Sequence, residues 1–578
     1  MILKRAIKPT LGIWDGHDAG IALLDDDQIV FAINEERLSR RKLDVGFPSE
    51  SLRAMMKYCG IVPGEIGDIA VSTTDFSKTL TRLFPSLRRR YYLIRRRKLA
   101  PGPLTSISKL AKYKLTEIPP SLLSRAVSKH VLRRQLAAAG FACPRLHFVD
   151  HHAAHAATAA FCSGYDDCLV LTIDGIGDGL SGSVWSFKRP ELKRLVSLDG
   201  RHSLGIFFEH VTNLLNMREL EDEGKVMALA NYAYPLPDKE NPLLSFVAVD
   251  GLRTKCRFGP LRLRHELAKV LWRYAPEQFA YMAQRTLEIR LIELVRNALK
   301  ATGHSLVAYA GGVASNVKAN MLIQELPEVS GLFIFPHMGD GGLAAGAALW
   351  HNFKTYGVSK VRLDNVFLGP DYNKDQIKEA LSRYPELEAT TLDDLPKRAA
   401  ELICEGEIIM WFQGRMEYGP RALGGRSILA LPGSHEIRDL LNLKLKRRVW
   451  YQPFCPTMLE EEAKQVLSNY RGPPNPFMTS AYRVHPSRRN LLQGTMSIDG
   501  TCRPQIIPSN VTGKFIDLLT SIKQKTGFGI VLNTSFNLHG EPLVCSPNDA
   551  LRTFVETEIN YLFINDLVVI KPRNINVV

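Results

Sequence analysis

Histidines cluster at the start of a predicted helix in this 578-residue chain. In the run DHHAAH (150–155), His151 and His155 are four residues apart, so on a helix both lie on one face, one turn apart. Two imidazole nitrogens could then bind one metal ion. The third ligand must come from elsewhere, and Asp340 in the run HMGDGG (337–342) is the best candidate. Such a ligand set suits a divalent metal that also holds nucleotide phosphates in its open positions.

Glycine-rich loops follow predicted strand ends at four places, residues 15–20, 174–179, 311–316 and 339–342. Glycines let backbone N–H groups approach phosphate oxygens closely, and acidic neighbours can hold a metal directly or through water. The loops therefore predict a nucleotide site. Its predicted residues are Asp15, Gly16, Asp174, Gly175, Gly177, Asp178, Gly311, Gly312, Asn316 and Asp340.

The elements that position these loops form a pattern that occurs twice. Apolar runs at 21–24 and 29–33 predict a hairpin, and the runs at 168–173 and 181–187 predict another. A further strand at 306–310 leads into the third glycine loop and then a helix. Two related α/β halves would produce such a pattern.

Length and composition limit the protein class. A chain of 578 residues predicts two or three domains, and 45% apolar with 23% charged residues is typical of a folded soluble protein. No apolar run is long enough for a transmembrane helix, and the start lacks the core of a secretory signal. Nine cysteines without a Cys-x-x-Cys pair argue against zinc knuckles and disulfide scaffolds. We therefore expect a cytoplasmic protein.

The net charge of +15 is concentrated in one segment, residues 78–134. Sixteen lysines and arginines stand there against a single acid, Glu117. A stretch like this could bind RNA, an anionic membrane surface or an acidic acceptor. It could equally be a solvated basic insertion in a variable loop. Nothing in it resembles a nucleic-acid-binding module.

The C-terminal half has its own run of basic residues, WFQGRMEYGPRALGGRS (411–427). Arginines spaced by glycines are unsuited to a core but suited to an anionic, planar substrate, because guanidinium pairs bidentately with phosphate and carboxylate oxygens. A strand end at 532–537 adds hydroxyl and amide groups to this predicted anion pocket. The pocket residues predicted from these runs are Arg415, Arg421, Ser535 and Asn537.

Together these runs resemble the NodU/CmcH/TobZ family of O-carbamoyltransferases. The glycine loops are similar to those of the actin-like ATPase fold, and His151, His155 and Asp340 resemble the metal site of threonylcarbamoyl-transfer proteins. The resemblance implies an α/β protein with an actin-like, duplicated RNase H-like domain at 1–370 and a YrdC-like domain at 371–578, with 78–134 as a basic insertion. The runs at 446–454 and 499–505 are similar to two further segments of the family, and this resemblance adds Lys446, Arg448 and Arg503 to the predicted anion pocket. Val449 and Gln452 depart from the family, which usually has Glu and Arg there.

The resemblance also implies a reaction. Carbamoyl phosphate would lose its phosphate at the arginine pocket, and the carbamate would attack the α-phosphate of ATP, bound with Mg²⁺, to give carbamoyl adenylate. An acceptor hydroxyl would then displace AMP, with His17 as the base. The implied catalytic residues are His17, Arg421, Lys446 and Arg448. The implied resident metal is Fe²⁺, with Mn²⁺ and Zn²⁺ as alternatives.

Three functions follow as hypotheses. The first is carbamoylation of a small hydroxylated acceptor such as a natural product or sugar; nucleic acid is not an expected partner, and a homodimer is left open. The second is a carbamoyl-transfer enzyme that modifies tRNA or a protein. The third is a non-catalytic nucleotide sensor or RNA scaffold, which would predict damaged metal ligands or phosphate loops, whereas His151, His155 and Asp340 are all present.

Overall fold

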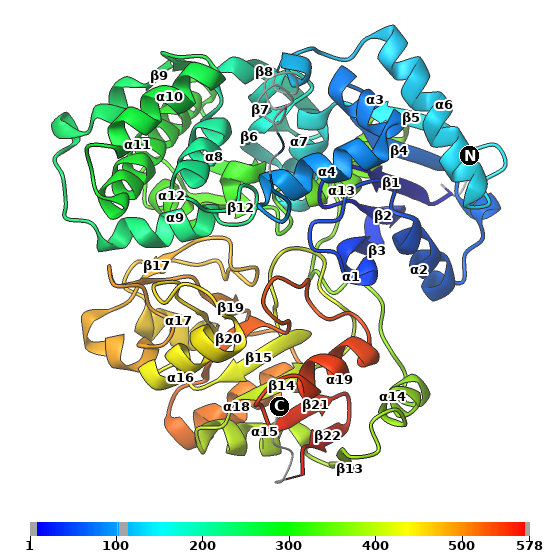
Figure 1. Cartoon of the computed structure of the whole chain (residues 1–578), viewed down its shortest axis with the longest axis vertical. Helices are drawn as coiled ribbons and strands as arrows, with labels where there is room; N and C mark the ends of the chain where they lie inside the picture. Colours follow the sequence, from blue (N-terminus) through cyan, green and yellow to red (C-terminus); the bar gives the residue numbers. More distant parts are fainter. Residues whose placement is uncertain (1–7, 101, 103–113, 573–578) are drawn as a thin grey trace. The chain divides into compact units, whose positions relative to one another are not determined.

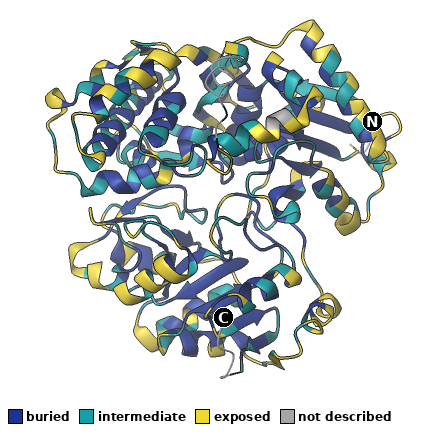
Figure 2. Ribbon diagram, viewed as in Figure 1, coloured by how far each residue is buried: buried dark blue, intermediate teal, exposed yellow. Residues whose placement is uncertain are grey.

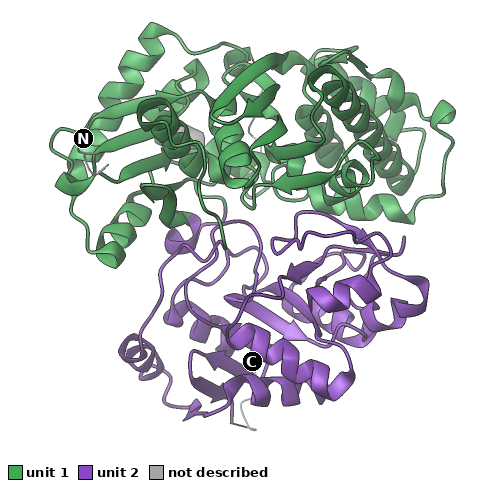
Figure 3. Cartoon of the chain, turned by 180° about the vertical axis from the view of Figure 1, so that it is seen from behind, with its two compact units in different colours: residues 1–35, 43–364 green, residues 36–42, 365–578 purple. Residues whose placement is uncertain are grey.

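The computed structural model describes residues 8–100, 102 and 114–572 of the chain. The chain divides into two compact units (Figure 3). Unit 1 comprises residues 1–35 and 43–364, and unit 2 comprises residues 36–42 and 365–578. The division falls at 364/365, whereas the sequence pattern placed it at 370, and the short segment 36–42 belongs to unit 2, which the sequence did not indicate.

Unit 1 contains two five-stranded sheets of the same design (Figure 1). In each, an antiparallel three-stranded meander is extended by two parallel strands. The first has the order β3-β2-β1-β4-β5 and the second β8-β7-β6-β11-β12. The repeated order confirms the predicted duplication. The strands are β1 (Thr10–Trp14), β2 (Gly20–Asp25), β3 (Gln28–Asn34), β4 (Asp68–Ser72), β5 (Leu146–Val149), β6 (Asp167–Gly177), β7 (Leu180–Lys188), β8 (Glu191–Asp199), β11 (Leu306–Ala310) and β12 (Gly331–Ile334).

Two helices rich in small residues pack against these sheets. Helix α7 (His151–Cys162) packs on the second sheet and helix α13 (Leu343–Tyr356) on the first, and the two helices pack against each other. Their approach is so close that a Cβ on Gly346 would lie 2.2 Å from the carbonyl oxygen of Ala154. The alanine-rich sequence of α7 is what permits this packing, because larger side chains would separate the backbones.

Further helices complete unit 1. The basic segment forms helices rather than an open loop, and the second half adds a helical layer and a small hairpin. The helices are α2 (Ser49–Cys59), α3 (Phe76–Leu83), α4 (Pro85–Arg95), α6 (Leu122–Ala138), α8 (Leu204–Leu214), α9 (Glu223–Leu229), α10 (Pro260–Leu271), α11 (Pro276–Thr302) and α12 (Val317–Gln324), and the hairpin is β9 (Val247–Asp250) with β10 (Arg253–Cys256). Helix α1 (Glu36–Ser39) lies in segment 36–42 and so belongs to unit 2.

Unit 2 is built on one eight-stranded mixed sheet with the order β13-β22-β21-β14-β15-β20-β16-β19. In its core, helices α15 and α18 pack against the fully buried Trp411 of β14. The central strands are buried along their length (Figure 2). The unit is mixed α/β, as expected; its likeness to YrdC stays a prediction. The strands are β13 (Glu388–Thr391), β14 (Ile409–Phe412), β15 (Arg426–Ala430), β16 (Cys455–Leu459), β19 (Gln505–Ile507), β20 (Ile530–Ser535), β21 (Tyr561–Ile564) and β22 (Leu567–Ile570).

The remaining elements of unit 2 lie around this sheet. They are the helices α14 (Lys374–Leu381), α15 (Leu395–Cys404), α16 (His435–Leu440), α17 (Glu460–Val466), α18 (Lys514–Thr526) and α19 (Pro547–Val555), and the short pair β17 (Tyr482–Arg483) with β18 (Thr501–Cys502).

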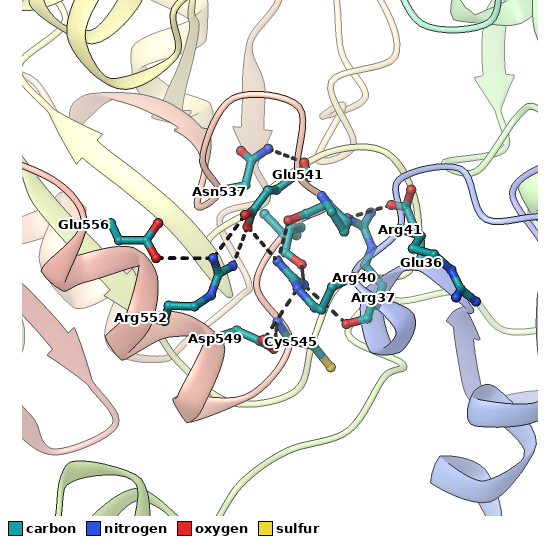
Figure 4. A network of polar contacts seen from close by, with 12 residues as sticks. Glu36, Arg37, Arg40, Arg41, Asn537, Glu541, Cys545, Asp549, Arg552 and Glu556 are labelled. Atoms are coloured by element: carbon teal, nitrogen blue, oxygen red, sulfur yellow. Dashed lines mark hydrogen bonds and ion pairs between the residues drawn. The ribbon is translucent and has the colours of Figure 1, made fainter. Parts of the chain in front are cut away.

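A polar network anchors segment 36–42 within unit 2 (Figure 4). The Arg40 guanidinium donates to the backbone carbonyls of Pro542 and Leu543, at 2.9 and 2.7 Å. It also forms ion pairs with Glu541 at 3.6 Å and Asp549 at 3.4 Å. These contacts join residues about 500 positions apart in the chain, which explains why no local pattern predicted them.

Candidate functional site

Four side chains of unit 1 converge as a candidate metal centre. They are His151, His155, Asp174 and Asp340, and one ligand atom from each lies within 4.8 Å of the others. His155 Nε2 lies 3.0 Å from Asp174 Oδ2 and 3.6 Å from Asp340 Oδ1. His151 Nε2 lies 3.4 and 3.6 Å from the same two oxygens. The three predicted ligands are thus brought together, and Asp174, which the sequence suggested for nucleotide binding, joins them as a fourth.

Local structure explains how these ligands meet. Asp150 caps the first turn of α7 by accepting the N–H of Ala153 at 2.7 Å, which starts the helix where His151 and His155 share a face. Asp174 lies in β6 beneath that face. Two glycines allow the close approach, because a Cβ on Gly177 would lie 2.3 Å from the His151 ring and one on Gly312 would lie 2.8 Å from Asp174.

The electrostatics of the cluster favour a cation. Although burial disfavours a charged imidazole, the carboxylates of Asp340 and Asp174 raise the pKa of His151 to about 9. Burial likewise opposes charge on Asp174, yet the two histidines hold the pKa of that carboxyl well below its usual range. The group therefore attracts positive charge, which a divalent metal can supply in place of a proton. Two imidazoles and two carboxylates fit Fe²⁺, Mn²⁺ or Zn²⁺.

His17, the predicted base, lies beside this cluster. Its Nδ1 is 3.5 Å from Asp340 Oδ2 and 3.4 Å from the Tyr92 hydroxyl. The His17 and Tyr92 rings stack with centroids 5.4 Å apart. Tyr92 belongs to α4 of the basic segment, so this helix covers the first glycine loop.

The predicted nucleotide residues differ in what their side chains do. Asp15 forms ion pairs with Lys78 and Arg82, both at 2.8 Å. Asp178 accepts the backbone N–H of His151 at 2.8 Å, and the side chain of Asn316 caps α12. These three side chains organise the loops. Asp174 and Asp340 belong to the metal cluster. The other members of the set are glycines and can act only through their backbone; they are Gly16, Gly175, Gly177, Gly311 and Gly312.

The basic segment is not simply a solvated insertion. Arg82 is 3% exposed, and the buried Arg95 and Arg96 pair with Glu219 and Glu221, at 2.6 and 2.5 Å. Acidic residues of unit 1 thus partly neutralise the segment's positive charge. These residues lie outside the interval 78–134, so the interval alone does not show them. Residues 101 and 103–113 of the segment lie outside the described residues.

Replacing Arg82 with methionine is expected to destabilise the protein by about 3 kcal/mol, because it leaves the Asp15 carboxylate buried with one cation fewer. Arg82→Met also loses the hydrogen bonds to the carbonyl of Thr73 and the hydroxyl of Ser128. The matched control is Arg89→Met in the exposed part of α4, with an expected effect below about 0.5 kcal/mol. Urea unfolding measures both; equal effects would contradict the structural role of Arg82.

Three arginines of unit 2 surround the thiol of Cys455, at the start of β16. Arg503 lies 2.9 Å from Cys455 Sγ. Burial and the neighbouring Arg503 lower the pKa of Arg421 to about 9, and burial lowers the pKa of Arg448 to about 10. The Nε of Arg421 and one terminal nitrogen of Arg448 are buried without a hydrogen-bond partner. Unpaired buried donors are costly, and an anion would satisfy them.

Lys446 adds a fourth cation to this anion pocket. Its Nζ donates to the side-chain oxygen of Asn537 at 2.8 Å and to the carbonyl of the same residue at 2.9 Å. Ser535 Oγ donates to Asn537 Oδ1 at 2.6 Å, so the strand-end residues hold the lysine. Burial, with Arg448 and Lys42 nearby, lowers the pKa of Lys446 well below its ordinary value. The crowding of cations in unit 2 therefore favours an anionic ligand.

The arginines of the run 411–427 have different roles in the structure. Arg415 donates to the carbonyls of Gly369 and Leu368, at 2.9 and 2.6 Å. Arg426 is fully buried, lies over the Phe412 ring and donates to backbone carbonyls. We therefore leave Arg415 out of the anion pocket, although the sequence placed it there. Only Arg421 of the three joins it.

The sequence reasoning missed other residues that shape the site. Cys455 had no recognisable signal, since one cysteine among nine is uninformative. Glu417 is buried, and its Oε1 accepts the backbone N–H groups of Leu423, Gly425 and Arg426 at 2.9, 2.7 and 3.0 Å. This fixes the loop that carries Arg421. The sequence signal for this role was that Glu417 is the single acidic residue of the glycine-containing run 411–427.

Among the described residues, no helix is long and apolar enough to cross a bilayer.

Comparison with known proteins identifies relatives along most of the chain. A family model described as "Carbamoyltransferase N-terminus" matches residues 9–349, and one described as "Carbamoyltransferase C-terminus" matches residues 400–571. Nodulation protein NolNO of Sinorhizobium fredii is 32% identical over 567 residues, covering 96% of this chain and 79% of that protein. Nodulation protein U of the same species is 30% identical over 270 residues, covering 46% of each chain.

Solved structures are more distant. Component A of the (R)-2-hydroxyglutaryl-CoA dehydratase of Acidaminococcus fermentans superposes with a TM-score of 0.34 at 13% identity, covering 60% of this chain and 97% of that one. A likeness of this size adds nothing on function.

Proposed function

This chain belongs to the carbamoyltransferase family, and on that premise we propose that it carbamoylates a hydroxyl group of a small-molecule acceptor, using carbamoyl phosphate and ATP. The predicted family resemblance and the enzyme class are thereby confirmed. The observation that carries the finer proposal is the anion pocket of unit 2. Among the described residues, no carboxylate forms an ion pair with Arg421, Arg448 or Arg503, so their charge is available to a ligand.

In unit 2, the pocket would hold carbamoyl phosphate. Arg421, Arg448 and Arg503 would bind the phosphate oxygens, because planar guanidinium groups match them bidentately. Positive charge stabilises the phosphate as its bond to the carbamoyl group breaks. Asn537 and Ser535 offer an amide and a hydroxyl to the carbamoyl N–H₂ and C=O, with Lys446 holding both in place. A water molecule would supply the oxygen that replaces the broken bond to the bridging oxygen, so the step is a hydrolysis whose products are carbamate and phosphate.

In unit 1, a carbamate oxygen would attack the α-phosphorus of ATP, and pyrophosphate would leave. A divalent metal bound by His151, His155, Asp174 and Asp340 would supply Lewis acidity toward phosphate oxygens. Backbone N–H groups of the glycine loops, that of Gly312 above all, would bind those oxygens as well, whereas the N–H of Gly311 already donates to the carbonyl of Met338 at 2.7 Å.

The second half of the reaction transfers the carbamoyl group. The acceptor oxygen would attack the carbamoyl carbon and AMP would leave. His17 would take the acceptor proton on Nε2, since Nδ1 contacts Asp340 and Tyr92. Tyr92 of α4 would thereby orient the base.

Pyrophosphate release from ATP tests the scheme before any acceptor is known. With metal-replete protein, we expect release only when carbamoyl phosphate is present. Inorganic phosphate in its place serves as the control for occupancy of the anion pocket. Release that is independent of carbamoyl phosphate, or none at all with excess of both substrates, would reject adenylation as the first step.

One support for the alternative, a tRNA- or protein-modifying carbamoyl enzyme, is weakened. It drew on the charge of segment 78–134, and Lys78, Arg82, Arg95 and Arg96 are now seen in ion pairs within unit 1. We therefore retain a small hydroxylated acceptor as the proposal.

A further inference from the structure

A second cluster of ligand-type side chains lies in unit 1, apart from the residues used above. Asp68, His147 and His351 each place one ligand atom within 4.8 Å of the others. Asp68 begins β4, His147 lies in the adjacent strand β5, and His351 comes from α13, which packs against this sheet. Three separate elements therefore supply the cluster.

The donor atoms have spacing suited to a small divalent ion. His147 Nε2 lies 2.8 Å from Asp68 Oδ1, and His351 Nε2 lies 3.6 Å from Asp68 Oδ2. Ligand atoms about 2.0–2.2 Å from a tetrahedral ion lie about 3.3–3.6 Å from one another. The separation of His351 from Asp68 matches this range, and His147, now at hydrogen-bond distance from Asp68, would move slightly apart when an ion binds. The planes of the two histidine rings are inclined at 34°, with centroids 4.2 Å apart.

One ligand atom of the cluster makes no hydrogen bond. His351 is 6% exposed, and its Nε2 is buried with no hydrogen bond. Its other nitrogen, Nδ1, lies 3.5 Å from the Thr355 hydroxyl, and the Tyr356 hydroxyl donates to Asp68 at 2.6 Å. Metal-binding histidines and carboxylates typically have such outer partners, which orient them. The side chain of His147 is 42% exposed, so the cluster is reachable from solvent.

The charges around the cluster permit an ion. Asp68 supplies the one carboxylate of the cluster, beside two imidazoles. Arg145 contacts only Oδ2 of Asp68, at 3.2 Å, and its side chain is 64% exposed, so it can turn toward solvent when a cation binds.

We propose that Asp68, His147 and His351 form a second site for a divalent ion of the Zn²⁺ class, which would tie β4 and β5 to the end of α13. The site is independent of the proposed reaction. With two imidazoles and one carboxylate it leaves a position for water, as three-ligand zinc sites do.

Zinc binding to the full-length chain tests this site. After chelator treatment and dialysis against Zn²⁺, His155→Gln protein, whose first site is disabled, is expected to retain one equivalent of zinc. Adding His351→Gln or His147→Gln is expected to remove that equivalent, while adding His130→Gln, on the exposed face of α6, is expected to leave it.

A second readout separates binding from misfolding. Zinc is expected to raise the Tm of His155→Gln protein by a few degrees and to leave that of the His147→Gln double variant unchanged. Because His147 is half-exposed, its substitution keeps the test valid if His351→Gln fails to fold. Zinc-free His155→Gln protein, or an equivalent that survives both cluster substitutions, would overturn the proposal.

Discussion

Arg421→Gln is expected to lower kcat/KM for carbamoyl phosphate at least about a hundredfold, measured as carbamoyl-phosphate-dependent pyrophosphate release. The loss corresponds to about 3 kcal/mol, which is typical of removing one charged partner of a desolvated, hydrogen-bonded ion pair. Arg421 has a buried unpaired Nε and lies with Arg503 and Arg448 around Cys455. Glutamine keeps part of the side-chain volume but cannot form the bidentate, charged contact.

Arg415→Gln is the matched control, because Arg415 stands in the same run but donates to the carbonyls of Leu368 and Gly369. It is expected to lower the Tm and to leave the KM for carbamoyl phosphate unchanged. If Arg415→Gln raised that KM as much as Arg421→Gln did, our assignment of only Arg421 to the anion pocket would be wrong. Added inorganic phosphate should protect the wild-type protein against heat and protect Arg421→Gln much less.

His155→Gln is expected to reduce the iron, manganese or zinc that co-purifies with the first site to less than about one-tenth, and to reduce pyrophosphate release at least about a hundredfold. His155 Nε2 faces both carboxylates of the candidate metal centre. Losing one ligand also leaves Asp174 and Asp340 close together with fewer neutralising partners. Both the metal and the local charge balance are therefore affected.

The neighbouring His152 supplies the control within the same helix. Burial lowers the pKa of His152 to about 3, and its ring contacts the Thr172 hydroxyl at 3.0 Å and the Leu180 carbonyl at 3.1 Å. His152→Gln is expected to reduce stability while keeping the metal. Metal analysis of both purified variants decides the matter, and equal metal loss in the two would show that helix α7, rather than the ligand set, had been damaged.

Much of unit 1 could be predicted because its signals are local. The run 150–155 has a capping aspartate, an alanine-rich continuation and histidines at i and i+4, so the helix and the shared face of His151 and His155 follow from short-range rules. The hairpins at 21–33 and 168–187 follow from alternating apolar runs and turn residues. The glycine loops at the strand ends also marked where the ligands gather.

The roles of charged residues could not be predicted in this way. Arg415, Arg421 and Arg426 look alike in the sequence, yet their roles differ. Arg415 donates to the carbonyls of Leu368 and Gly369, Arg421 belongs to the anion pocket, and Arg426 is a buried structural cation. The outcome depends on which carbonyls, rings and carboxylates surround each guanidinium. Those neighbours come from distant parts of the chain.

By itself, the sequence determined the duplicated α/β plan, the helix that presents the histidines, the runs that identify the family and most of the residues now proposed for the two sites. Only the tertiary structure decided that Asp174 joins the metal cluster, that Lys78 and Arg82 neutralise Asp15, and that segment 36–42 belongs to unit 2. Periodicity and capping depend on neighbours within a few residues, and the sequence displays them directly. Ion pairs and ligand sets depend on distances between elements, and these exist only after the sheets and helices have packed.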